Sequence, residues 1–139
     1  MYKGLYYEDF KDIALRLKWY PESFSILIVC KQKELMQNFS KLITKITDIK
    51  PKFVGKDQIR FVNNNVLIDI IMNINSAKGR RINTLIVDSN LSFKEIDEIF
   101  VPMLRFPCQD IYLFSSEYVL NENCKLNAES SSDGFTYGF

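Results

Sequence analysis

The apolar positions of this chain follow two spacings, one typical of helices and one typical of buried strands. In residues 8–19 they recur three and four positions apart, which predicts a helix with one buried stripe, formed by Phe10, Ile13, Ala14 and Leu17. Pro21 ends this pattern. Residues 24–30 then form a continuous run rich in β-branched side chains, which predicts a strand buried on both faces, as in a parallel sheet.

Both patterns recur further along the chain. Residues 32–47 predict a second helix, whose buried stripe is Leu35, Phe39, Leu42, Ile43 and Ile46. Residues 58–62 and 66–74 predict two strands. Three asparagines, residues 63–65, join these strands, and because asparagine tolerates positive φ they predict a hairpin turn. Pro51 and Gly55 mark the loop that precedes the hairpin.

Two more strands are predicted at residues 84–88 and 111–115, with a helix between them. Ser92 and Glu95 form a capping box at the start of this helix, and Leu91 and Ile96 are spaced as its hydrophobic staple. Pro102 ends or kinks it. The order of elements predicts the α/β class, with a mainly parallel sheet, flanking helices and a β-hairpin. Right-handed crossovers place strands 24–30, 84–88 and 111–115 side by side.

We interpret residues 1–139 as one domain, with an N-terminal helical segment (1–22) and a polar tail (120–139). The net charge of +1 excludes a global basic field that would attract nucleic acid or membrane, although a local patch remains possible. No apolar run is long enough for a membrane span. Three well-spread cysteines favour reduced thiols and a cytoplasmic location, and the absence of histidine removes imidazole chemistry.

Four segments together carry a resemblance to a known family. They are the strand and helix of residues 24–49, the hairpin of residues 58–74, the run Lys-Gly-Arg-Arg-Ile-Asn-Thr-Leu-Ile-Val-Asp ending at Asp88, and the helix of residues 96–104. Phe114-Ser115-Ser116 follows them. In this order they resemble the middle of the ATPase domain of phage large terminase subunits, over roughly residues 24–116. The resemblance implies a truncated P-loop-ATPase-like fold, a viral origin, and Asp88 in the place of the ligand of the nucleotide's magnesium ion.

The chain departs from that family at its two essential chemical pieces. The phosphate-binding pattern G-x-x-x-x-G-K-[ST] is absent, and Gly55-Lys56 is followed by Asp57 and lies after the second helix. Ser89 stands where the family has its catalytic glutamate. Because phosphoryl transfer depends on these groups, we interpret Asp88 and Ser89 as the remnant of a nucleotide and metal site. We therefore expect no ATP hydrolysis and neither magnesium nor ATP as a cofactor.

Several residues allow more than one interpretation. Asp88 fits a magnesium ligand or a cap for the turn after its strand, and with Asp69 it could form a carboxylate pair for metal-assisted nuclease chemistry. The basic cluster Lys78, Arg80 and Arg81 fits phosphate contacts or a solvated loop. Its arginines could instead pair with Asp88 or Glu95.

The dense N-terminal aromatics are a candidate protein interface, formed by Tyr2, Tyr6, Tyr7 and Trp19. The resulting hypothesis is a non-catalytic, degenerate terminase-like protein that binds a protein partner or regulates DNA packaging or a related process, in the host cytoplasm. Two alternatives stay open. One is a DNA-binding accessory protein that uses the basic cluster. The other is a partial ATPase subunit whose P-loop comes from a partner.

Overall fold

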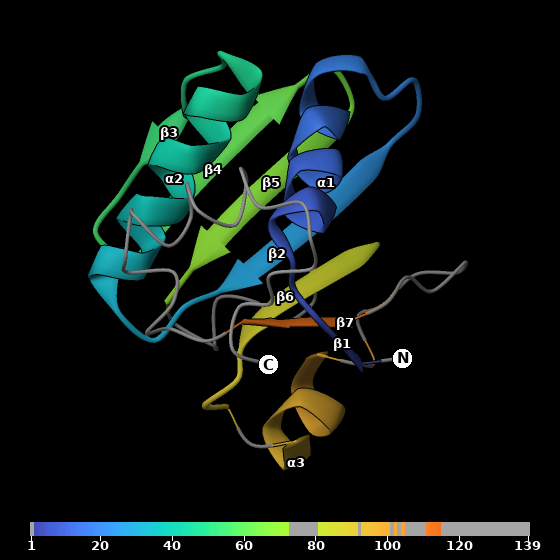
Figure 1. Ribbon diagram of the computed structural model, residues 1–139, viewed down its shortest axis with the longest axis vertical. Helices are drawn as coiled ribbons and strands as arrows, with labels where there is room; N and C mark the ends of the chain where they lie inside the picture. The colour runs from blue at the N-terminus through green and yellow to red at the C-terminus, as the bar shows by residue number, and fades with distance from the viewer. Residues whose placement is uncertain are drawn as a thin grey trace.

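The strands lie in one seven-stranded sheet in the order β1-β7-β6-β2-β5-β4-β3 (Figure 1). A computed structural model describes residues 2–72, 81–91, 93–100, 102, 104 and 111–114. The strands are β1 (Tyr2–Gly4), β2 (Phe24–Val29), β3 (Phe53–Val54), β4 (Gln58–Asn63), β5 (Val66–Ile71), β6 (Thr84–Asp88) and β7 (Ile111–Phe114). Strands β1, β7, β6, β2 and β5 are parallel, and β4 and β3 extend the sheet in antiparallel fashion. The predicted α/β class, the mainly parallel sheet and the hairpin are confirmed.

Helices α1 (Tyr7–Trp19) and α2 (Lys33–Thr47) cover one face of this sheet (Figure 1). Their apolar stripes pack on side chains of β2, β4, β5, β6 and β7 and form the larger core cluster. Phe39 of α2 lies at its centre, with its ring centroid 5.3 Å from that of Phe10 and 4.9 Å from that of Phe114. The apolar stripes predicted from the sequence are therefore the surfaces through which both helices pack on this face.

A second apolar cluster covers part of the opposite face. It is built on β2, β6 and β7 and includes Leu91 and Ile96, the two residues predicted to staple a helix start. Here the chain forms the short helix α3 (Phe93–Glu95) and then the π-helical turn η2 (Ile96–Phe100). The capping serine of this helix, Ser92, lies outside the described residues.

The same face turns polar where it continues onto β5 and β4. Side chains alternate between the faces of a strand, and directly paired residues share a face. The registers place Leu27 opposite Asp69, Asp69 opposite Arg60, and Arg60 opposite Phe53. A charged pair and an aromatic ring therefore replace the apolar residues that fill the α1–α2 side.

Two strands were not predicted from the sequence. Strand β1 has three residues and β3 has two, too few to show a hydrophobic period. Strand β1 exists because it pairs with β7, more than a hundred residues later in the chain. The hairpin turn was predicted, and Asn64 adopts φ 54°, in the left-handed region that asparagine tolerates. The predicted tail (120–139) lies outside the described residues.

Candidate functional site

Asp88 lies at the carboxyl end of β6, between β2 and β7. Strands β2 and β6 are neighbours in the sheet. After β6 the chain continues to β7 on one side of this pair, and after β2 it continues to the strands on the other side, so the strand order reverses between them. In open α/β sheets, ligands bind beyond the carboxyl ends of strands at such a reversal. Asp88 therefore occupies the position at which an α/β protein of this kind most often carries its site.

The Asp88 side chain holds the turn that follows its strand. Its Oδ1 atom accepts a hydrogen bond of 2.9 Å from the backbone N–H of Asn90, and its backbone carbonyl accepts one of 3.0 Å from Leu91. The Oδ2 atom is buried and has no hydrogen-bond partner among the residues that the structure describes. Ser89 is exposed, and its backbone N–H donates to the carbonyl of Phe114. Asp88 therefore caps the turn after its strand, as one of the two interpretations expected, and it does so through Oδ1 alone.

Cys30 lies at the carboxyl end of β2, on the same face as Asp88. Both residues are fully or almost fully buried. Burial raises the pKa of the Cys30 thiol well above its usual range, and the negative charge of Asp88 raises it further. The thiol is therefore protonated and unreactive in the folded chain.

We expect Cys30 to resist alkylation in the folded protein, because the thiolate is the reactive species. Iodoacetamide labelling followed by peptide mass spectrometry should modify Cys30 only after denaturant is added. The unfolded thiol ionises near its usual pKa of 9.0 whereas the folded thiol does not, so stability should fall as the pH rises above that value. Rapid labelling of Cys30 under native conditions would contradict this description.

The connection between β1 and α1 is the strand-to-helix turn that precedes β2. It has only two residues, Leu5 and Tyr6. Leu5 is buried and continues the β1–β7 ladder through a 2.8 Å hydrogen bond to the carbonyl of Leu113. The N–H of Tyr6 donates to Asp9 Oδ2 at 3.2 Å, and Glu8 adds a second carboxylate in the first helical turn. Carboxylates in the first turn interact favourably with the positive N-terminal end of the helix dipole. They therefore repel a phosphate group at the position where it would bind.

Asp69 and Asp88, considered above as a carboxylate pair, do not meet. Asp69 pairs with Leu27 in the register, whereas Asp88 lies three residues beyond Leu85, which also pairs with Leu27. The alternation of side chains therefore turns the two carboxylates to opposite faces of the sheet. No group of three or more metal-binding side chains lies together among the described residues.

The predicted basic cluster is only partly within the described structure, because Lys78 and Arg80 lie outside the described residues. Arg81 is exposed, and its side chain forms no ion pair with a described carboxylate, including Asp88 and Glu95. Its suggested pairings with those two residues are therefore absent from the described part of the chain.

The four predicted interface aromatics do not form one surface. Tyr7 is buried in the core, so it offers no ring to a partner in this structure. Tyr6 and Trp19 are exposed but lie at opposite ends of α1, about 20 Å apart by the helical rise. Trp19 packs on Tyr20, with ring centroids 5.7 Å apart.

Tyr2 gains an aromatic neighbour that the sequence did not indicate. Its ring meets Phe93 edge-on at a centroid distance of 5.2 Å, and its hydroxyl donates to Asp97 Oδ1 at 2.5 Å. This hydrogen bond, aided by burial and the charge of Asp97, raises the pKa of Tyr2 to about 12. Phe93 remains 59% exposed. We call Tyr2, Phe93 and Asp97 the β1 edge cluster.

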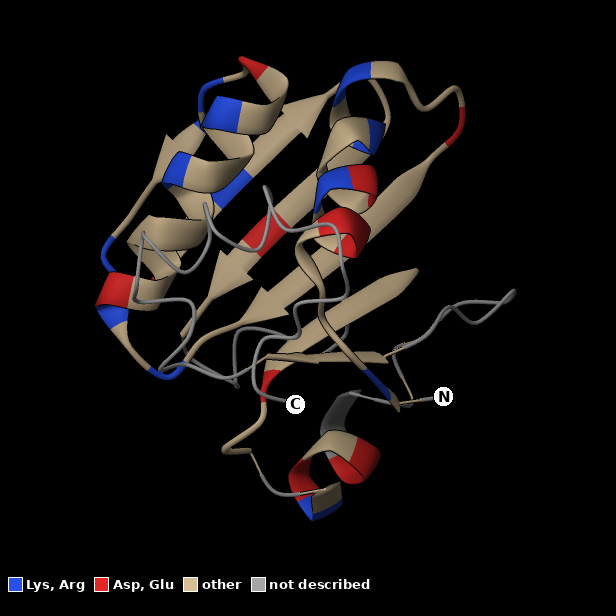
Figure 2. Cartoon of the chain, in the orientation of Figure 1, with Lys and Arg blue, Asp and Glu red and all other residues tan. Residues whose placement is uncertain are grey.

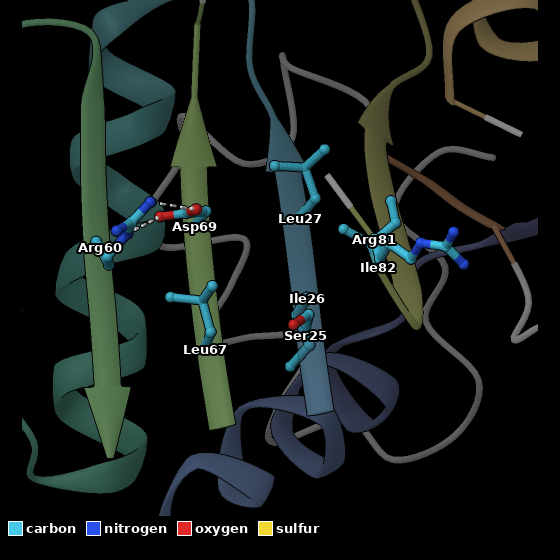
Figure 3. A pocket seen from close by; sticks show the side chains of 8 residues that line it. All are labelled: Ser25, Ile26, Leu27, Arg60, Leu67, Asp69, Arg81 and Ile82. Carbon is cyan, nitrogen blue, oxygen red and sulfur yellow. Dashed lines mark hydrogen bonds and ion pairs between the residues drawn. The ribbon is translucent and has the colours of Figure 1, made fainter. Parts of the chain in front are cut away.

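The polar side of the sheet contains a cavity of about 350 Å³, lined by Ser25, Ile26, Leu27, Arg60, Leu67, Asp69, Arg81 and Ile82. Figure 3 shows Arg60 and Asp69 pointing toward each other from neighbouring strands, with Arg81 turned away from them. Arg60 binds Asp69 through two bonds of 2.8 Å and 3.1 Å, and Gln58 adds a third of 3.1 Å. Asp69 is buried, while the Arg60 side chain is 39% exposed.

From the sequence, Asp69 was predicted only as half of a metal site, and Arg60 was not predicted as a site residue. None of the described helices is long and apolar enough to cross a membrane. Comparisons with protein-family models, with curated proteins and with solved structures found no match.

Proposed function

We propose that this protein is a non-catalytic domain of P-loop ATPase ancestry that acts by binding a partner protein. The observation that carries the proposal is the closed turn between β1 and α1. In P-loop proteins the phosphates lie on a glycine-rich loop between a strand and the N-terminus of the next helix. Here two residues make that connection, and Asp9 occupies the helix start. A phosphate would meet carboxylates in place of free N–H groups.

The position of Asp88 supports the ancestry part of the proposal. A buried acidic residue at the carboxyl end of a central parallel strand is where the resemblance to terminase ATPase domains places a magnesium ligand. With Ser89 exposed beside it in place of a glutamate, the site lacks a base to position water. Its present role is to hold the turn at Asn90.

The binding surface that we assign is the β1 edge cluster. Tyr2 and Phe93 expose adjoining aromatic rings beside a three-residue edge strand, and aromatic residues dominate the energetic centres of protein interfaces. The hydrogen bond from the Tyr2 hydroxyl to Asp97 fixes the orientation of the Tyr2 ring. A photoreactive aromatic at position 93 should therefore capture a partner in the source cells. The same group in place of Lys11, exposed on α1, serves as the control.

We expect no phosphate release from ATP by the purified chain in the presence of magnesium, and no change on Asp88→Ala. A colorimetric phosphate assay and titration with a fluorescent ATP analogue measure turnover and binding separately. Phosphate release that Asp88→Ala abolishes would contradict the non-catalytic proposal. Release only after mixing with a P-loop protein would favour the partial-subunit alternative.

A further inference from the structure

We propose that the β3–β4 hairpin (residues 50–63) and the cavity beside it form a binding site for single-stranded nucleic acid, with Phe53 stacking a base. Arg81 of the basic cluster lines the far side of this cavity, but the proposal is carried by the hairpin residues and does not depend on the function proposed above. Three observations carry it: the charge of the hairpin, the exposed ring of Phe53, and the oriented side chain of Arg60.

The first part of this hairpin carries a local excess of positive charge. Residues 50–60 contain four basic residues, Lys50, Lys52, Lys56 and Arg60, against one acidic residue, Asp57. These residues alone sum to +3, and Asp69, which pairs with Arg60, lowers the local charge to +2 in a chain whose net charge is +1. The three lysines are exposed. Figure 2 shows basic residues at the β3–β4 edge of the sheet, and further ones on helix α2, which covers the opposite face. Such a local field suits a polyanion.

The Phe53 ring is exposed and lies against the turn of its own hairpin. It is 52% exposed on an edge strand, although a phenylalanine is normally buried. The ring lies against Gly55, since a β-carbon added to Gly55 would stand 2.7 Å from Phe53 Cε2. The glycine thus leaves room for the ring to rest on the turn. Proteins that bind single strands combine such exposed aromatic rings with basic residues, because each unpaired base can stack on a ring.

Arg60 extends the site from the ring into the cavity. It is the direct cross-strand neighbour of Phe53, so both side chains project from the same face. Asp69 holds Nε and Nη2 of Arg60, which leaves its Nη1 donors without a partner among the described residues. Because the pair with Asp69 fixes the guanidinium, little entropy is lost when those donors meet a phosphate. The adjoining cavity has the size of a small-ligand pocket.

The occupant is a single strand rather than a duplex or an acidic peptide. A base inside a duplex has no free face for Phe53, whereas an unstacked base does. An acidic peptide would satisfy the lysines but would not use the flat face of the ring. A free mononucleotide and an oligonucleotide both contain a nucleobase joined to phosphate. The test therefore measures the binding of each of them separately.

The test is fluorescence anisotropy with a labelled oligothymidine of about 16 nucleotides, at several salt concentrations. We expect Phe53→Ala to weaken binding between about 5-fold and about 150-fold, the range for loss of one stacked base. Gly55→Ala should weaken binding less, because it displaces the ring without removing it. Lys52→Ala should lower the slope of log affinity against log salt by about 0.7. Phe93→Ala and Lys11→Ala are the matched controls on other elements and should bind normally.

Five outcomes would overturn the proposal. The first four are no binding of oligothymidine at low salt, equal binding of the Phe53→Ala variant, full competition by polyglutamate, and loss on Arg81→Glu without loss on Phe53→Ala. The fourth result would assign binding to the Lys78–Arg81 cluster. Competition by adenosine monophosphate alone, with no added affinity for the oligonucleotide, would make the site a mononucleotide pocket and would equally contradict the proposal.

Discussion

The Phe39→Ala variant is expected to lose about 3 to 5 kcal/mol of its free energy of unfolding. The Phe39 ring is buried between Phe10 of α1 and Phe114 of β7, so its removal opens a cavity where three elements meet. The backbone of α2 cannot close that cavity, because the helix is held along its length by Leu35 and Ile43. The cost should therefore lie in the range for a large buried aromatic.

Urea denaturation followed by circular dichroism measures this loss. The control is Phe53→Ala, the same substitution on an exposed edge strand, which should cost less than about 1 kcal/mol. If Phe39→Ala is too unstable to purify, Phe39→Leu keeps most of the volume and should cost on the order of 1 kcal/mol. Equal stabilities of the Phe39→Ala and Phe53→Ala variants would show that the described core is not the one that holds the fold.

The Arg60→Leu variant is expected to lose about 2 to 3 kcal/mol, because it removes both hydrogen bonds of the ion pair between Arg60 and the buried Asp69 carboxylate. We place the cost below the full value for a buried pair because Arg60 is partly exposed and water screens it. The hydrogen bond from Gln58 to Asp69 is neutral and does not replace this ion pair.

A double variant separates the charge from the packing. Arg60→Leu together with Asp69→Leu removes both charges and should recover most of the lost stability, because a paired apolar substitution leaves no buried charge. Thermal or urea unfolding of the two single variants and the double variant completes the cycle. A stability loss for Arg60→Leu below about 0.5 kcal/mol, the usual range for surface changes, would mean that the pair contributes nothing measurable.

The candidate site was only partly predictable. Asp88 could be found because a polar residue that ends an apolar strand is visible in the sequence, and the structure places it at the carboxyl edge as expected. The burial of Asp88 Oδ2 and the proximity of Cys30 could not be predicted, because both depend on which strands are neighbours in the sheet. Arg60 and Asp69 had an available signal: the asparagine turn fixes the hairpin register, and that register sets them directly opposite each other.

The aromatic residues show the opposite limit. Tyr2, Tyr7 and Trp19 look alike in sequence, yet one lies on an edge strand, one is buried, and one is exposed at the far end of α1. The spacing of apolar residues identifies which face of an isolated helix is apolar. It does not predict which other element packs on a given aromatic side chain. Phe53 was not predicted as a site residue for the same reason, because its two-residue strand forms only by pairing with β4.

The sequence by itself determined the local elements: two amphipathic helices, the hairpin and its turn, the buried strands, and the missing phosphate loop. These follow from spacings of two and 3.6 residues and from the chemistry of single residues, which act within a few positions. Only the tertiary structure decided the rest. Pairing with β7 created β1 and closed the β1–α1 turn, pairing with β4 created β3, and the sheet registers turned Asp69 and Asp88 to opposite faces. The energy of such contacts depends on partners distant in the chain, and the local pattern does not contain them.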